Sequence, residues 1–300
     1  MTTHADLDEF SFLADDARDQ SAAVPDAERV QLTLPDGRTL SAIRFGSGAP
    51  RTVFLHGAGL NAHTWDRTVI DLDAPAIAVD LPGHGDSSWR DDADYAPETL
   101  APDVIRAIEE WADAPVTLVG QSLGGLAASH AAAARPDLIA DLVLVDIVPG
   151  IGSGGPSPLA PFYARLEFAS IDDVLDHAQA FGLGGARDTA LRGVLLNTRT
   201  RPDGVVEWKH HLARVLSDAA EDAPSLRDHR DADWSALRHV GAPITLIRGS
   251  RGYLGDADIA SFRTAQPAAA IVTVDAPHNV QETAHLDIAR ILRPILSERN

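Results

Sequence analysis

Short, wholly apolar segments recur along the chain and alternate with segments of helix length. The apolar segments lie at residues 51–56, 76–80, 116–120, 142–146, 243–249 and 269–275. Strands that are apolar at every position are typical of a parallel sheet covered by helices on both faces. The intervening patterns predict crossover helices at residues 62–69, 97–112, 123–134 and 256–264, and a last helix at 285–297. The hydrophobic pattern therefore predicts an α/β fold with a mostly parallel sheet.

The segment before this alternation predicts a tail and a hairpin. Residues 1–28 are acidic and irregular, which indicates a loosely attached N-terminal tail. Residues 28–34 and 38–45 then flank Asp36-Gly37, a dipeptide that favours a tight hairpin turn.

One long interval interrupts the alternation. Between Asp146 and Pro243 the pattern is helical, with no convincing strand, and the interval opens with a segment rich in glycine and proline. Long insertions between sheet strands are more often functional lids than structureless loops. We therefore predict a helical cap at residues 150–235, inserted into a core formed by residues 29–149 and 236–300.

Composition and charge exclude several classes of protein. The 300 residues are 45% hydrophobic and 23% charged, as in ordinary globular proteins, and they include no cysteine for disulfides, thiolate nucleophiles or cysteine-bound zinc. The net charge of −19 repels phosphate groups and anionic lipids, so neither nucleic acid nor a membrane is an expected partner. The chain has no apolar stretch long enough for a membrane span, and its acidic start does not resemble a signal peptide, so we expect a cytoplasmic protein.

A serine occupies the sharpest turn that the pattern predicts. Residues 120–124 read Gly-Gln-Ser-Leu-Gly, a G-x-S-x-G motif between a buried strand and a helix of small residues. Glycines are needed at the flanks because side chains there would collide with neighbouring backbone. The turn lifts Ser122 above the sheet edge, at a helix N-terminus that stabilises developing negative charge. Ser122 is the candidate nucleophile; the alternative is a serine that merely completes a tight turn.

Three further segments carry a family resemblance. The sequence His56-Gly57-Ala58-Gly59 ends the first buried strand, residues 80–88 read D-L-P-G-H-G-D-S-S, and His278 follows the last strand. Together with residues 120–124 they resemble the alpha/beta-hydrolase fold family, over roughly residues 29–298. The resemblance implies a doubly wound, mostly parallel, eight-stranded sheet with the cap inserted after the sixth strand.

The resemblance also implies roles for individual residues. His278 would be the general base that takes the serine proton, since serine is a poor nucleophile without one; the alternative is a capping or surface histidine. The backbone N–H groups of Leu123 and Ala58 would form the oxyanion hole. His56 and His84 would be scaffold residues.

The acid that orients the base has more than one candidate. The family usually places an aspartate after the seventh strand, as G-x-x-D, but this chain has Gly252 there. Some branches place the acid after the sixth strand, where Asp146 closes an apolar segment. A buried carboxylate needs a partner, which a histidine Nδ1–H would provide. We favour Asp146 as the acid, with Asp256 or Asp258 as alternatives. If Asp146 is not the acid, its role is that of a structural aspartate at the cap hinge.

Large side chains near the motif and in the cap indicate a substrate pocket or simple packing. Trp65 follows the oxyanion loop, and Phe162, Leu166 and Trp208 lie in the predicted cap. As a pocket they would suit a small apolar acyl or ring-containing substrate. Four arginines in the cap form either a solvated face or a dock for a carboxylate or phosphopantetheine group, namely Arg187, Arg192, Arg199 and Arg201.

These features predict a cofactor-free, carboxylesterase-like serine hydrolase. It would cleave carboxylic esters, lactones or thioesters through an acyl-enzyme on Ser122, and no histidine spacing indicates a metal site. One alternative is a carbon–carbon bond hydrolase of ring-cleavage products, although these usually carry a longer glycine-proline run in the oxyanion loop. Another is a non-catalytic binding protein on the same scaffold, an idea that only the missing G-x-x-D acid supports.

Overall fold

The structure, a computed structural model, describes residues 7–151, 160–183, 185, 187–217 and 229–297. Eight strands form one sheet in the order β1-β2-β4-β3-β5-β6-β10-β11. The hairpin of β1 (Ala27–Thr33) and β2 (Thr39–Phe45) is antiparallel, and β2 also pairs antiparallel with β4 (Ala76–Asp80). The remaining strands are β3 (Thr52–Leu55), β5 (Val116–Gln121), β6 (Ile139–Val145), β10 (Ile244–Arg251) and β11 (Ala270–Pro277). From β4 to β11, each strand pairs in parallel with the next one in the sheet order. The predicted mostly parallel, eight-stranded sheet is confirmed.

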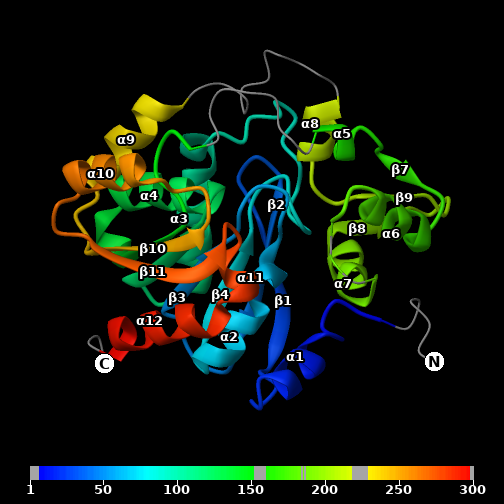
Figure 1. Ribbon diagram of the computed structural model, residues 1–300, viewed down its shortest axis with the longest axis horizontal. Helices are drawn as coiled ribbons and strands as arrows, with labels where there is room; N and C mark the ends of the chain where they lie inside the picture. The colour runs from blue at the N-terminus through cyan, green and yellow to red at the C-terminus, as the bar shows by residue number, and fades with distance from the viewer. Residues whose placement is uncertain (1–6, 152–159, 184, 186, 218–228, 298–300) are drawn as a thin grey trace.

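Helices cover both faces of this sheet (Figure 1). One face carries α3 (Pro97–Trp111), α4 (Leu123–Ala134), α9 (Arg230–His239) and α10 (Asp256–Ala265). The other carries α1 (Leu13–Asp19), α2 (Asp66–Leu72), α11 (Val280–Thr283) and α12 (His285–Ser297). A hydrophobic cluster lies on each face of the sheet. Because the strands contribute side chains to both clusters, they are apolar at nearly every position. The predicted helix at 62–69 is divided: a 3₁₀ turn, η2 (Ala62–Trp65), precedes α2.

The predicted cap contains strands as well as helices. Between β6 and α9 the described elements are α5 (Ala160–Tyr163), β7 (Glu167–Phe168), α6 (Ile171–Ala180), α7 (Arg187–Asn197), β8 (Thr198–Thr200), β9 (Val206–Trp208), α8 (Leu212–Ser217) and a sheet of order β7-β9-β8. The expectation of an interval without strands is therefore wrong, because these strands are too short to leave a periodic pattern. A separate hydrophobic cluster supports the segment's treatment as a unit. Residues 152–159 and 218–228 of the predicted cap lie outside the described residues.

The C-terminal boundary of the predicted cap, residue 235, falls inside a helix. α9 runs across it, and both Trp234 and Leu237 pack in the cluster on the α3 and α4 face of the large sheet. This helix therefore belongs structurally with the core.

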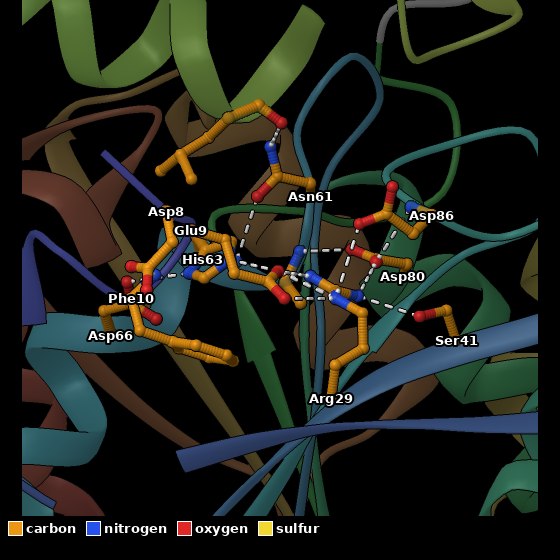
Figure 2. A network of polar contacts seen from close by, with 12 residues as sticks. Asp8, Glu9, Phe10, Arg29, Ser41, Asn61, His63, Asp66, Asp80 and Asp86 are labelled. Atoms are coloured by element: carbon orange, nitrogen blue, oxygen red, sulfur yellow. Dashed lines mark hydrogen bonds and ion pairs between the residues drawn. The ribbon is translucent and has the colours of Figure 1, made fainter. Parts of the chain in front are cut away.

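The N-terminal segment, predicted as a loose tail, is ordered and attached from residue 7 onward. Leu13 and Ala17 of α1 are buried in the cluster on the α2 and α12 face. The carboxylate of Glu9 accepts hydrogen bonds from the Arg29 guanidinium and lies 3.2 Å from His63 Nε2, as Figure 2 shows. The prediction failed because α1 is held by partners far along the chain rather than by its own pattern. Residues 1–6 lie outside the described residues.

Polar contacts tie the predicted cap to the core at several places. Near α1, Arg192 of α7 pairs with the buried carboxylates of Asp16 and Asp66. On the other side, the indole Nε1 of Trp89 donates to the Lys209 carbonyl at 2.7 Å, and the Trp89 ring stacks on His211 at a centroid distance of 4.5 Å. Asn61 Nδ2 also donates to the Leu196 carbonyl at 3.2 Å, so the cap segment is anchored on the core at several places.

Within the described residues, no helix is both long enough and apolar enough to cross a membrane.

Candidate active site

The turn that carries Ser122 has the geometry that its glycines predict. β5 ends at Gln121, α4 begins at Leu123, and Ser122 between them has φ 51° and ψ −122°. A Cβ on Gly120 would lie 2.5 Å from the Gly124 carbonyl oxygen, and one on Gly124 would lie 2.6 Å from the Leu55 carbonyl oxygen. The positive φ of Ser122 costs energy in a non-glycine residue, and such values are concentrated at functional sites. The turn therefore holds a strained serine at the N-terminus of a helix.

The loop after β3 lies directly against this serine. A Cβ on Gly57 would collide with Gln121 Oε1 and lie 3.1 Å from Ser122 Cβ, so a side chain there would force its neighbours to move. The loop is fixed by His56, whose Nε2 accepts the Leu81 N–H at 3.0 Å and whose Nδ1 therefore donates to the Gly57 carbonyl at 2.8 Å. Complete burial lowers the pKa of His56 to about 4, so it is neutral at pH 7. Ala58 follows Gly57 in this loop, beside Ser122.

The predicted base and acid are hydrogen-bonded to each other. His278 follows β11, and its Nδ1 lies 2.8 Å from Oδ2 of Asp146, the residue after β6. An ionised carboxylate can only accept, so Nδ1 carries the proton and Nε2 keeps its lone pair. That tautomer is the one a general base requires.

The Asp146 carboxylate is fully buried and has three hydrogen-bond donors. Oδ1 accepts the Gly249 N–H at 2.9 Å, and Oδ2 accepts the Tyr253 N–H at 2.9 Å in addition to His278. Asp146 also has a positive φ of 49°, a conformation that aspartate tolerates better than most residues. The proposed nucleophile and the proposed acid, Ser122 and Asp146, therefore both have a positive φ.

Gly252, at the family's usual acid position, provides the space for this carboxylate. A Cβ on Gly252 would lie 2.5 Å from the carboxylate carbon of Asp146 and closer still to both oxygens. The glycine and the aspartate are therefore two parts of one arrangement: the side chain absent from the loop after β10 leaves room for the one that arrives from β6.

The alternative acids have other partners. Asp256 has a side chain that is 98% exposed, and its Oδ1 pairs with Arg248 at 3.2 Å. Asp258 accepts the Gly255 N–H at 2.8 Å and so caps α10, of which Gly255 is the N-cap residue. Neither carboxylate is hydrogen-bonded to His278 in the contacts of the described residues.

Adjacent strands bring the candidate residues to one edge of the sheet. β5, β6, β10 and β11 are consecutive parallel neighbours, and Ser122, Asp146, Tyr253 and His278 all follow their carboxyl ends. Gln121, the residue before Ser122, links this turn to the loop of His278, because its Nε2 donates to the His278 carbonyl at 3.4 Å. Ligands of open α/β sheets bind at this edge.

The four predicted pocket residues are mainly packing residues. Trp65 is fully buried in the core cluster, where its ring centroid is 4.8 Å from that of Phe54, so it presents no surface to a pocket. Phe162 and Trp208 are buried together in the cap's own cluster, and Leu166 packs against it. A residue that the sequence did not single out is nearer the site: Tyr163 Oη would lie 3.2 Å from a Cβ on Gly59 in the oxyanion loop.

The arginines of the cap are paired with acids. Arg187 bonds Asp172 and Asp176, Arg201 bonds Glu167 and Asp203, Arg199 bonds Glu207, and Arg192 bonds Asp16 and Asp66. The suggested dock for a carboxylate or phosphopantetheine group is therefore not supported. Among the described residues, no group of three or more histidine, aspartate or glutamate side chains is arranged to hold a metal ion.

Known proteins resemble this chain over most of its length. The model of the alpha/beta hydrolase family matches residues 52–291. The chain is 37% identical to Esterase Rv0045c of Mycobacterium tuberculosis, over 98% of this chain and 97% of that protein, and 29% identical to Lipase LipV of the same organism, over 85% and 97%. A solved structure of the M. tuberculosis esterase superposes with a TM-score of 0.81 and 34% identity, covering 97% of this chain and 99% of that one. The chain therefore belongs to the alpha/beta hydrolase family.

Proposed function

We propose that the protein is a cofactor-free serine hydrolase that cleaves carboxylic esters, with Ser122 as nucleophile, His278 as general base and Asp146 as the acid that orients it. The class of enzyme follows from whole-chain similarity to an esterase at 37% identity. The roles of the residues rest chiefly on one observation, the 2.8 Å hydrogen bond between His278 Nδ1 and the buried Asp146 carboxylate. That bond also supports Asp146 as the acid in place of the missing G-x-x-D aspartate, whose absence was the argument for a non-catalytic protein.

The proposed reaction has two steps. Ser122 Oγ attacks the ester carbonyl while His278 Nε2 takes its proton, and the backbone N–H groups of Leu123 and Ala58 stabilise the oxyanion. The protonated imidazole then gives that proton to the leaving alcohol as the carbon–oxygen bond breaks, which leaves an acyl-enzyme. In the second step a water molecule attacks the acyl carbonyl while His278 Nε2 takes its proton. The imidazole then returns a proton to Ser122 Oγ as the acyl–oxygen bond breaks, and the carboxylic acid is released. Asp146 remains ionised and stabilises the imidazolium.

The substrate class follows from the surroundings of the site. Tyr163, a member of the largely apolar cap cluster, lies against Gly59 of the oxyanion loop, which supports a small ester with an apolar acyl chain or ring as the substrate. Lactones and thioesters present the same electrophilic carbonyl and belong in the same assay panel. A series of chromogenic esters of graded acyl length measures the preference directly.

Substitution of each triad residue tests the assignment. Ser122→Ala should reduce kcat on the order of 10⁶-fold and abolish labelling by a fluorophosphonate probe. Asp146→Asn should cost about 10⁴-fold, because an amide no longer selects the required tautomer. Asp256→Asn is the matched control, since its exposed carboxylate pairs only with Arg248 in the described contacts. A fully active Ser122→Ala enzyme, or an Asp256→Asn loss that equals that of Asp146→Asn, would overturn the assignment.

A further inference from the structure

An exposed aromatic ring lies flat against the imidazole of His278. The rings of Tyr253 and His278 are stacked, with centroids 3.9 Å apart and an interplanar angle of 14°. The Tyr253 residue is 64% exposed, which makes it the most exposed of the large hydrophobic residues in the described part of the chain. A large ring left open to solvent contributes little to the core, so its contact with His278 requires another explanation.

The backbone of the loop after β10 determines where this ring lies. The Tyr253 N–H donates to Asp146 Oδ2, the same oxygen that accepts from His278 Nδ1. On the N-terminal side, the Gly252 N–H donates to the Gly249 carbonyl at 3.0 Å and closes a turn; on the other side, Leu254 is buried in the core cluster. One short loop thus holds the acid with its backbone and covers the base with a side chain.

We propose that Tyr253 is a positioning residue for His278, which rests on the proposed role of His278 as general base. The stacked Tyr253 ring blocks one face of the imidazole, so the imidazole is less free to rotate about its Cβ–Cγ bond and keeps the orientation that its bond to Asp146 sets. The face of the Tyr253 ring attracts positive charge, and such charge develops on the imidazole when it takes the serine proton. Tyr253 therefore stabilises the positive charge that forms on the imidazole during the reaction.

Apart from Asp146, the charged and titratable groups around His278 have separate partners. Asp146 faces its Nδ1 from the end of β6. In the adjoining loop Arg251 pairs with Asp275, and in α11 Glu282 bonds Thr64 and Asn279 rather than the imidazole. Burial raises the pKa of Glu282, so this group can itself contribute to a pH profile. Glu282→Gln is therefore a suitable background in which to repeat the measurement.

Substitutions at residue 253 separate ring stacking from mere bulk. Tyr253→Phe keeps the ring, Tyr253→Leu keeps apolar volume, and Tyr253→Ala removes both. With a neutral chromogenic ester, Leu and Ala should lower kcat about 3- to 10-fold and move the acidic limb of the kcat/KM profile to lower pH by about half a unit, because loss of the aromatic face destabilises imidazolium. Phe should restore both values. Phe181→Ala is the matched control, since it removes a second exposed aromatic ring that contacts a histidine, His177, in the cap.

The outcomes distinguish this proposal from the proposed function. Tyr253→Ala and Tyr253→Leu enzymes with wild-type kcat and an unchanged pH profile would refute the positioning role, even if KM rose. If His278→Ala retained full activity, the proposed function itself would fail, whatever happens at residue 253. Thermal unfolding of each variant identifies any loss caused by misfolding, which an exposed side chain should not produce.

Discussion

Addition of a single methyl group at Gly252 should displace the proposed catalytic acid. The new Cβ would lie 2.5 Å from the Asp146 carboxylate carbon, about 1 Å inside normal van der Waals contact. The carboxylate has little freedom to move away, because the N–H groups of Gly249 and Tyr253 and the His278 ring hold it. Gly252→Ala must therefore break the bond to His278 or shift the loop after β10.

The structure sets the size of both consequences. Overpacking of a well-filled site costs about 1–3 kcal/mol, and disturbance of a charge-assisted hydrogen bond adds about 1.5–3 kcal/mol. A loss near 3 kcal/mol lowers the Tm of a protein of 300 residues by about 5 °C. For catalysis, a displaced acid leaves His278 without its tautomer selection, so kcat should fall about 10²- to 10⁴-fold. Steady-state kinetics and calorimetry measure the two effects on the same sample.

Two further variants make the test specific. Gly241→Ala is the matched control, because a Cβ there meets no atom within 4 Å, and it should leave kcat and Tm nearly unchanged. Asp146→Gly combined with Gly252→Asp returns the carboxylate to the family's usual position, and glycine suits the positive φ at residue 146. This double variant should be at least about tenfold more active than Asp146→Gly alone. A fully active Gly252→Ala enzyme would refute the reasoning, since it would show that the buried carboxylate is not needed where it lies.

Two more predictions concern stability. Although burial acts to lower the pKa of His63, the carboxylates of Asp66 and Glu9 outweigh it and raise that pKa to about 9, so the stabilisation is complete below pH 6.5 and is lost as the pH rises through 9. Urea unfolding should show a loss of up to about 3 kcal/mol over that range, and a His63→Asn variant should show a flatter pH dependence. Trp89→Ala should weaken one anchor of the cap and cost about 1–3 kcal/mol, because the ring is only partly buried, with faster proteolysis of the cap segment; equal proteolysis rates would contradict the anchor.

The parts of the fold that the sequence predicted share a local physical cause. The buried strands could be recognised because both of their faces are covered, so each reads as a continuous apolar segment. The helices at 123–134 and 285–297 coincide with α4 and α12. An alanine-rich composition favours the first, and a long amphipathic pattern marks the second. At residues 120–124 the glycines are dictated by backbone collisions within the turn itself. In each case the determining contact lies close in sequence or follows a repeated pattern.

The parts that were missed depend on distant partners. Helix α1 has only seven residues and is held by Arg67 and Arg192, which no local pattern reveals. Trp65 looked equally suited to a pocket or to the core, and only the fold places it against Phe54. Tyr253 carries no signal in the sequence, because its importance comes from a histidine on another strand.

The choice between acid positions also has a structural basis that a motif search does not capture. β6 and β10 are parallel neighbours, so their carboxyl ends lie only about 4.8 Å apart, and an aspartate on either strand can place its carboxylate at the same point beside His278. Only one side chain fits there, as the clash predicted for any Cβ on Gly252 demonstrates. An aspartate after β6 therefore requires glycine in the loop after β10. The absence of the usual acid, which first suggested an inactive protein, is instead a condition for the proposed one to reach His278.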